Sequence, residues 1–298
     1  MGEYKHFKDG IGEFGAYLGV PNKYYHDMLD YCSSTQLKYL YSNSPFHFKA
    51  RYIEKIITVP ATSDAMLLGS AVHSLCLTPK EFDGEFFTMP ACDLRTKVGK
   101  AIKAKALDAA GGKSLLSESM YKQARGISKS VFGSAAAAKL LAPGFDPEVT
   151  FLWECPLTGL KMRAKADGVR VSGKHLIEFK TTRSANPEQF QRQAYNLHYE
   201  LSAAHYLEGA RRCGFDVEDM YFITAETTEP YAVQCYKASD EFLQVGHDKW
   251  LDATRMLASG LEKGEWPGYI DEDSEEYPLL MPPKWATVNT DIDMEEIG

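Results

Sequence analysis

The segment from residue 149 to 180 constrains the fold most, because it reads as three short strands joined by two tight turns. The turns are Leu157-Thr158-Gly159 and Ser172-Gly173, and the strands are VTFLWEC, LKMRAKADGVRV and HLIEFKT. Aromatic and β-branched runs bounded by glycine-containing turns are typical of hairpins. We therefore expect an antiparallel meander.

Helical patterns lie on both sides of this meander. Before it, the cluster Ser33-Ser34-Thr35 is a good helix start, and residues 33–56 predict two short helices with a break at Pro45. The run AMLLGSAVHSLCL predicts a buried helix. After the meander we expect one long helix from Asn186-Pro187 to about Arg212, two strands, DMYFITAET and AVQCYK, and a helix over about 239–263. The fold class is therefore α/β (α+β).

The length of 298 residues and the apolar content of 44% fit one decorated domain that folds by itself. We expect a largely helical part over 1–145, the sheet with its helices over 146–264, and a tail over 265–298. From Glu262 onward, 11 acidic residues face 2 basic ones, which is typical of an extended, solvated segment.

The net charge of −8 is unevenly distributed. Residues 1–180 carry 24 basic and 18 acidic residues, whereas the rest of the chain carries 9 and 23. Because phosphate binding depends on local basic patches, the negative total does not exclude nucleic acid. Lys97, Lys100 and Lys103 recur on roughly one helical face, as a solvated surface or as a phosphate-contacting stripe.

Targeting signals and cysteine clusters are both missing from the sequence. No run approaches the roughly 20 apolar residues of a membrane span, and the first residues lack the order of a signal peptide. The six cysteines form no CxxC pair, which argues against a zinc site, an iron–sulfur cluster or a disulfide framework. We expect a cytoplasmic location with reduced cysteines.

Two carboxylates and a lysine in the meander form the strongest candidate site. Asp167 lies on the second strand, and Glu178-Phe179-Lys180 lies on the third. Neighbouring strands can bring an Asp and a Glu to one hard cation such as Mg²⁺, while a Lys two residues beyond the Glu points the same way. Such a group is suited to phosphodiester hydrolysis, with Asp167, Glu178 and Lys180 as catalytic residues.

A longer set of motifs resembles the RecE-type exonucleases, also called exodeoxyribonuclease VIII-like, of the PD-(D/E)XK superfamily. The pieces occur in the family's order over roughly residues 20–240: SPFHFKARY, LLGSAVHSLCLTPKEF, PEVTFLWECPLTGLKMRAKADGV, LIEFKTT and LSAAHYLEG. The resemblance implies a restriction-endonuclease-like core, a central mixed sheet flanked by helices, with an N-terminal helical extension.

The same resemblance implies further site residues. His73 of GSAVH would join Asp167 and Glu178 at the metal, and Glu148 is either a further ligand or a surface glutamate. Imidazole suits Mn²⁺ better than Mg²⁺, so Mn²⁺ should also support activity. Tyr206 matches the tyrosine of the QxxxY element, but this chain has Ser202 where glutamine is typical.

Several polar residues near the acidic core are candidate DNA contacts. Arg163 and Lys165 alternate with apolar residues, so they share the face of Asp167 and either hold phosphate or balance the carboxylates. Thr181 and Thr182 follow Lys180 at the strand exit, and Ser202 could reach the DNA through water.

The function implied is resection of one strand of linear double-stranded DNA, 5′ to 3′, for recombination by single-strand annealing. The resemblance also implies a homo-oligomeric ring and an annealing protein as partner. The alternatives are a structure-selective or single-strand endonuclease of the same superfamily, and a DNA-binding module without catalysis. A serine hydrolase built on Ser70, Ser74 and His73 is disfavoured because no GxSxG elbow is present.

Overall fold

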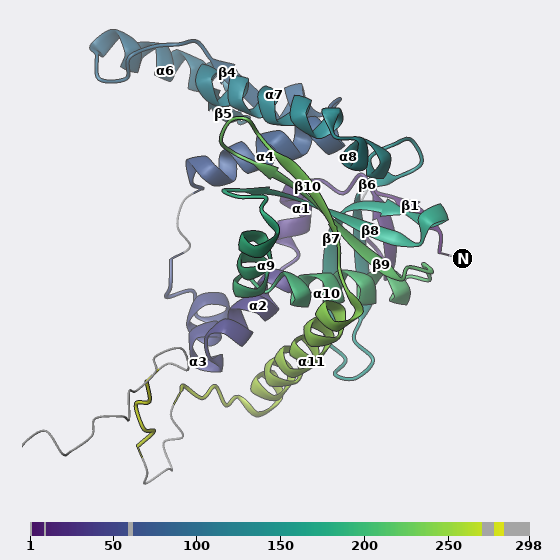
Figure 1. Ribbon diagram of the computed structural model, residues 1–298. Helices are drawn as coiled ribbons and strands as arrows, with labels where there is room; N and C mark the ends of the chain where they lie inside the picture. Colours follow the sequence, from purple (N-terminus) through teal and green to yellow (C-terminus); the bar gives the residue numbers. More distant parts are fainter. Residues whose placement is uncertain (1, 9, 59–61, 270–276, 283–298) are drawn as a thin grey trace, which may run out of the picture.

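A computed structural model describes residues 2–8, 10–58, 62–269 and 277–282 (Figure 1). An eight-stranded mixed sheet forms the centre of this part of the chain. Its strand order is β1-β2-β6-β7-β8-β9-β10, and β3 pairs with β7 beside this path. The strands are β1 (Tyr4–His6), β2 (Gly15–Leu18), β3 (Cys32–Ser33), β6 (Asp146–Glu154), β7 (Lys161–Arg170), β8 (His175–Thr182), β9 (Asp219–Glu226) and β10 (Val233–Lys237).

The predicted meander is confirmed, because β6 pairs with β7 and β7 with β8 in antiparallel register. The two later strands extend it, since β9 runs parallel to β8 and β10 antiparallel to β9. The expected fold class, a mixed sheet flanked by helices, is therefore confirmed as well.

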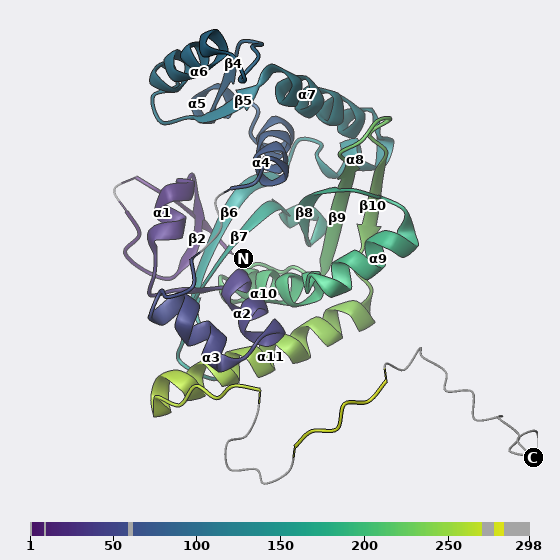
Figure 2. The ribbon, with the colours of Figure 1, turned by 90° about the vertical axis from the view of Figure 1, so that its left-hand side faces the viewer.

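Helices cover both faces of the sheet (Figures 1 and 2). On one face lie α2 (Ser34–Ser42), α9 (Pro187–Asn196), α10 (Tyr199–Arg212) and α11 (Asp240–Lys263). Their apolar sides meet Phe151, Trp153 and Met162 from the strands, all of which are buried. A side chain of this size contributes about 1.5–3 kcal/mol when it is fully buried.

The opposite face carries α4 (Asp64–Leu77), α7 (Glu118–Gly133) and α8 (Ala135–Leu140). Val72 and Ile127 of these helices pack against Ile177 and Phe179 of β8. Leu176 of β8 packs in the other core, so successive residues of this strand serve opposite faces. Glu178 and Lys180 therefore leave β8 on the side of Leu176, toward α2 and α10.

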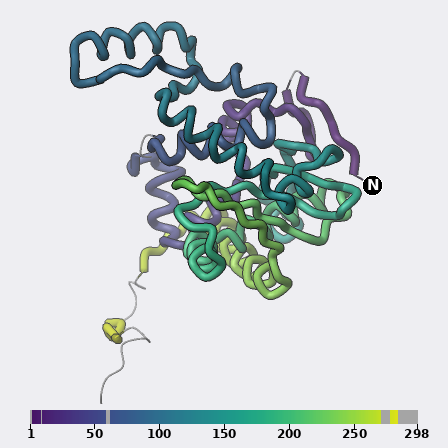
Figure 3. The backbone as a smooth tube through the Cα atoms, turned by 45° about the horizontal axis from the view of Figure 1, so that its top comes forward, coloured from purple at the N-terminus to yellow at the C-terminus, as the bar shows by residue number. Residues whose placement is uncertain are grey.

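An excursion between α4 and α7 extends away from the sheet (Figure 3). It comprises α5 (Phe82–Glu85), β4 (Phe86–Met89), α6 (Lys97–Ala110) and β5 (Ser114–Ser117), with β4 and β5 pairing in parallel. The basic segment predicted as a helix forms α6, and Lys97, Lys100 and Lys103 are exposed on it.

The prediction of one long helix over 186–212 is wrong. The chain forms α9 and α10, separated at Leu197 and His198, and His198 has a left-handed φ of 52°. Histidine is among the residues that adopt this conformation more readily, although it still costs about 1–2 kcal/mol. A hydrogen bond of 3.0 Å between His198 Nδ1 and Glu200 Oε1 accompanies the turn.

The N-terminal helices follow the predicted break at Pro45. Gln36 Oε1 accepts a hydrogen bond of 2.8 Å from the backbone N–H of Ser33, which starts α2 as a capping box. A second helix, α3 (Pro45–Phe48), continues into a π-helical turn at Lys49–Ile53. Between β2 and β3 lies α1 (Asn22–Asp27).

The start of the acidic tail packs against α3. Trp266 stacks on Phe48 with ring centroids 5.9 Å apart, and the Phe46 N–H donates to the Pro267 carbonyl at 3.0 Å. Residues 264–269 and 277–282 form no helix or strand. The remainder of the predicted tail, residues 270–276 and 283–298, lies outside the described residues. No helix of the described chain has the length and apolar character that a membrane span requires.

Candidate active site

The site begins where β7 and β8 separate. Their ladder runs from the pair Arg170–His175 to the pair Gly168–Ile177 and stops there. Beyond it, the Asp167 carboxylate takes the place of a strand partner, because its Oδ2 accepts a hydrogen bond of 2.7 Å from the Phe179 N–H. Where the β7–β8 ladder ends, this hydrogen bond therefore holds Asp167 between the two strands.

Glu148 lies next to Asp167 on the adjacent strand. The β6–β7 ladder pairs Pro147 with Gly168 and Val149 with Ala166, but the residues between them, Glu148 and Asp167, do not pair. Glu148 has a φ of 55°, a left-handed conformation that costs a non-glycine residue about 1–2 kcal/mol. Strain of this kind is often concentrated at functional sites.

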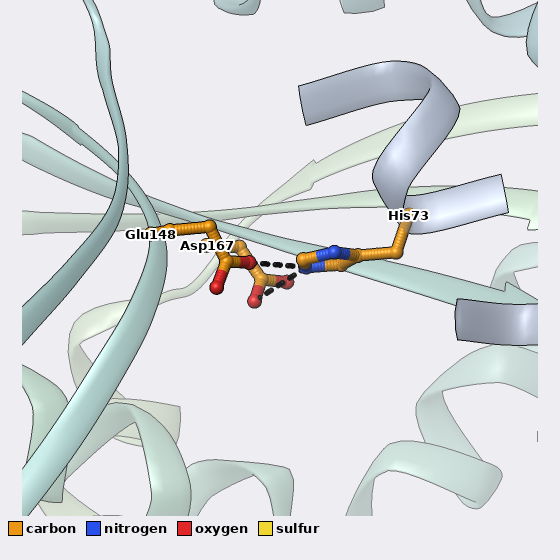
Figure 4. A group of neighbouring side chains, drawn as sticks. All are labelled: His73, Glu148 and Asp167. Carbon is orange, nitrogen blue, oxygen red and sulfur yellow. Dashed lines mark ion pairs between the residues drawn. The ribbon is translucent and has the colours of Figure 1, made fainter. Parts of the chain in front are cut away.

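His73 reaches these carboxylates from α4 (Figure 4). Its Nε2 lies 2.9 Å from Asp167 Oδ1 and 3.3 Å from Glu148 Oε1. One turn earlier, Gly69 lets the helix approach β8, since a Cβ there would lie 3.1 Å from Thr181 Oγ1. The glycine of GSAVH therefore helps to bring the histidine within reach of the strands.

The electrostatics of this trio match those of a cation site. Burial lowers the pKa of His73, but the Asp167 and Glu148 carboxylates outweigh it and raise that pKa to about 9. Burial raises the pKa of Asp167, but the positive charge of His73 more than reverses this and leaves it below its ordinary value. One candidate ligand atom from each of His73, Glu148 and Asp167 falls within 4.8 Å of the others.

Glu178 and Lys180 form a second pair beside the trio. Lys180 Nζ donates to Glu178 Oε1, whereas Glu178 Oε2 is buried and has no hydrogen-bond partner in the described chain. Burial, and then the negative charge of Asp167, raise the pKa of Glu178 to about 7. An unpaired buried carboxylate oxygen costs about 1–3 kcal/mol, which a cation or a donated proton would relieve.

The two predicted basic contacts are held within the protein. Arg163 is buried, and its guanidinium donates to the carbonyls of Tyr25 and Met28. Lys165 Nζ lies 2.7 Å from Glu148 Oε2 and 2.6 Å from Asn22 Oδ1. Both cations therefore attach the N-terminal segment to β7, a contact that the alternation pattern alone could not reveal.

The remaining predicted residues divide into two groups. Thr181 and Tyr206 line the same cleft as His73, Asp167 and Lys180, which has a volume of about 1580 Å³. Thr182 and Ser202 are buried; Thr182 Oγ1 bonds Gln193 Oε1 at 3.0 Å, and Ser202 Oγ lies 3.5 Å from the His198 carbonyl. These two hydroxyls bond within the protein rather than facing the cleft.

The sequence did not single out Lys38 and Tyr199, which lie near Lys180. The Lys180 ammonium is 5.4 Å from the Tyr199 ring centroid, and Lys38 Nζ is 5.6 Å from the same centroid. No motif or spacing marked either residue, because they come near Lys180 only through the packing of α2 and α10 against β8.

A solved structure resembles this fold at low sequence identity. A protein of Eubacterium rectale described as a "Putative exonuclease" gives a TM-score of 0.61 at 16% identity, covering 89% of this chain and 96% of that chain. SSO0001 covers 78% of this chain and 86% of that chain at 13% identity, but its TM-score of 0.28 does not indicate a shared fold.

The sequence was also compared with curated proteins and with family models. No curated protein of similar sequence was found. The model of the PDDEXK-like domain of unknown function (DUF3799) matches residues 33–275, which is most of the chain and contains every residue of the candidate site. The chain therefore belongs to this PDDEXK-like family.

Proposed function

We propose that this protein is a metal-dependent exodeoxyribonuclease of the RecE type. It would resect one strand of linear double-stranded DNA, 5′ to 3′, for recombination by single-strand annealing. The supporting observation is the meeting of His73, Glu148 and Asp167 beside the Glu178–Lys180 pair. The nuclease-like fold of the family agrees with this assignment.

The residues fit a divalent cation. His73, Glu148 and Asp167 would hold it, and Glu178 has a buried oxygen without a partner to offer. Carboxylate oxygens suit Mg²⁺, and the imidazole suits Mn²⁺. A bound divalent ion would supply Lewis acidity to the phosphate and lower the pKa of water.

Lys180 would act on the phosphate itself. Its ammonium has three donors, and the pairing with Glu178 uses one of them. A second donor can stabilise negative charge on a phosphoryl oxygen or orient the attacking water. Tyr206 lines the cleft from α10 and is a further candidate for contact near the scissile bond.

The predicted DNA contacts take different roles in this proposal. Thr181 lines the cleft and would meet the backbone of the strand being cut, whereas Lys165 would balance the charge of Glu148, with which it pairs at 2.7 Å. Arg163 would hold the N-terminal segment as one wall of the cleft, since its guanidinium donates to carbonyls there. Thr182 and Ser202 would position β8 and α10 through their hydrogen bonds.

The resemblance to RecE-type exonucleases also supports a proposal about assembly and location. The chain would form a homo-oligomeric ring of three or four copies and work in the cytoplasm with a single-strand annealing protein. Light scattering of the purified protein measures the number of copies, and a monomer at micromolar concentration would contradict the ring.

The decisive experiment is digestion of matched linear and covalently closed duplex DNA with Mg²⁺, Mn²⁺ or EDTA. The linear DNA is labelled in separate samples at its 5′ ends or at its 3′ ends. Metal-dependent loss of linear DNA alone, with early release of the 5′ label, is the expected result.

Other results would favour the competing functions. Cutting of the closed circle would indicate an endonuclease. Early release of the 3′ label would reverse the polarity. Binding of DNA without cleavage under any metal would leave a DNA-binding module.

A further inference from the structure

A strip of aromatic and basic side chains leads away from the active site on the α2 and α10 side of β8. We call it the aromatic–basic strip, and its members are Lys38, Tyr41, Lys180, Tyr195, Tyr199 and Lys249. It begins at Lys180, whose ammonium shares the Tyr199 ring with Lys38 at 5.4 and 5.6 Å.

The strip continues across α2 to the junction of α9 and α10. Lys38 and Tyr41 are three residues apart on α2, so they share a face. The Lys249 ammonium lies between two rings. Its Nζ is 5.5 Å from the centroid of the Tyr41 ring and 4.0 Å from the centroid of the Tyr195 ring. Two groups of cation–ring contacts, joined by the shared face of Lys38 and Tyr41 on α2, therefore connect Lys180 with Tyr195.

The cations of the strip are not equally compensated. Lys180 pairs with Glu178, and Lys249 pairs with the buried Glu200 at 2.6 Å. Lys38 makes no ion pair within the described chain. Burial, and then the positive charge of Lys180, lower the pKa of Lys38 to about 8. Because Lys38 lacks a paired carboxylate, an anion beside it would supply the missing counter-charge.

The far end of the strip exposes apolar surface. Tyr195 is 53% exposed and Leu197 is 49% exposed, and both precede the left-handed His198 that separates α9 from α10. An exposed ring next to a cation, as Tyr195 is beside Lys249, is typical of single-strand nucleic-acid sites, where each stacked base contributes about 1–3 kcal/mol.

We propose that the aromatic–basic strip binds single-stranded nucleic acid extending from the cleavage site. Lys38 contacts a backbone phosphate and acts as a positioning residue, and Tyr195 stacks against a base. This inference rests on the proposed nuclease function, because the strip begins at its candidate catalytic lysine.

The test measures binding of a fluorescent oligothymidylate to the full chain in EDTA, which removes cleavage. Tyr195→Ala should weaken binding by about 5- to 150-fold. Lys38→Ala should weaken it and reduce the slope of log K against log salt by about 0.7, the value for one phosphate of a single strand. Lys38→Arg should restore the slope.

Matched controls are Lys129→Ala on α7 and Tyr269→Ala, which change an exposed lysine and an exposed tyrosine outside the strip. Both should bind within about twofold of wild type, since surface sites away from the ligand contribute little. Melting temperatures should show that all variants are folded.

Wild-type affinities and salt slopes in both strip variants would overturn the inference, as would wild-type protein that binds no oligothymidylate. Digestion of linear duplex by the wild type tests the proposed function separately. Cleavage with unaltered binding in the variants would therefore reject the strip alone. Loss of binding in a protein that never cleaves would support the strip and reject the nuclease.

Discussion

Two histidines approach the sheet from helices on opposite faces, and their surroundings differ. His73 of α4 faces two carboxylates in an open cleft, and these hold its pKa at about 9. His205 of α10 is fully buried; its Nε2 donates to the Arg163 carbonyl at 2.8 Å, and its Nδ1 accepts from Trp250 Nε1 at 3.0 Å. Burial lowers the pKa of His205 to about 4.

The difference shows that the groups around the ring nitrogens, rather than the position on a helix, decide whether a histidine near the sheet is protonated and can bind a ligand. Both ring nitrogens of His205 are used within the core, which fixes a neutral imidazole and leaves no position for a ligand. The Nε2 of His73 faces only carboxylates, so a cation can replace the proton that it carries there. Four predictions test this comparison.

The largest effect is expected for Asp167, which faces His73, and for Glu178 beside it. Asp167→Asn or Glu178→Gln should reduce cleavage by about 10³-fold or more, because several kcal/mol of transition-state stabilisation depend on metal binding. Initial rates on labelled linear duplex measure this loss. Glu154→Gln, an exposed glutamate of the same sheet, is the control, and near-normal cleavage by Glu178→Gln would falsify the central assignment.

Substituting each histidine should separate activity from stability. His73→Ala should lower cleavage by about 10²-fold, with partial recovery when the metal is changed. His205→Ala should lower the free energy of unfolding by about 2–4 kcal/mol, because it removes two hydrogen bonds and leaves a cavity. Cleavage rates per folded molecule and urea midpoints distinguish the loss of activity from the loss of stability. A destabilised His73→Ala with normal cleavage, or a stable His205→Ala with impaired cleavage, would contradict the comparison.

The pH dependence of stability should report the neutral state of His205. The unfolded chain takes up this proton below about pH 6.5, whereas the folded protein does so only near pH 4. Stability from this residue is therefore complete above pH 6.5 and falls by about 3 kcal/mol toward pH 4. Urea unfolding of wild type and His205→Gln at several pH values measures this loss. The same fall in the free energy of unfolding in both proteins would show that His205 titrates normally.

The smallest effect is the stabilisation by metal alone. Mn²⁺ at 100 times its dissociation constant should raise the free energy of unfolding by about 2.7 kcal/mol, since it binds only the folded site. Thermal melting measures the shift. It should vanish in His73→Ala and persist in His205→Gln, and a shift retained in both would place the ion elsewhere.

Most of the sheet could be predicted from local patterns. The meander from 149 to 180 follows alternation and glycine turns, and those signals depend on near neighbours in the chain. The break at His198 could not be predicted, because its left-handed conformation accompanies contacts of Glu200 with His198 and with Lys249 of α11. Such contacts override the helical propensity of the segment.

The candidate site was predictable to the level of residue types. ExK spacing singled out Asp167, Glu178 and Lys180, and the resemblance to RecE-type exonucleases added His73 as a candidate for the same site. Alternation placed Arg163 and Lys165 on one face but could not show that Tyr25, Met28 and Asn22 hold them. Those partners lie more than a hundred residues away, where no periodicity connects them.

By itself, the sequence determined strands β6 to β10, many of the helices and the residue types available for a cation site, because these follow from patterns among near neighbours in the chain. Only the tertiary structure decided that His73 meets Asp167 and Glu148 while His205 stays in the core. Both histidines lie on helices among apolar neighbours. Their protonation is set by charges and hydrogen bonds that the packed sheet brings from distant segments.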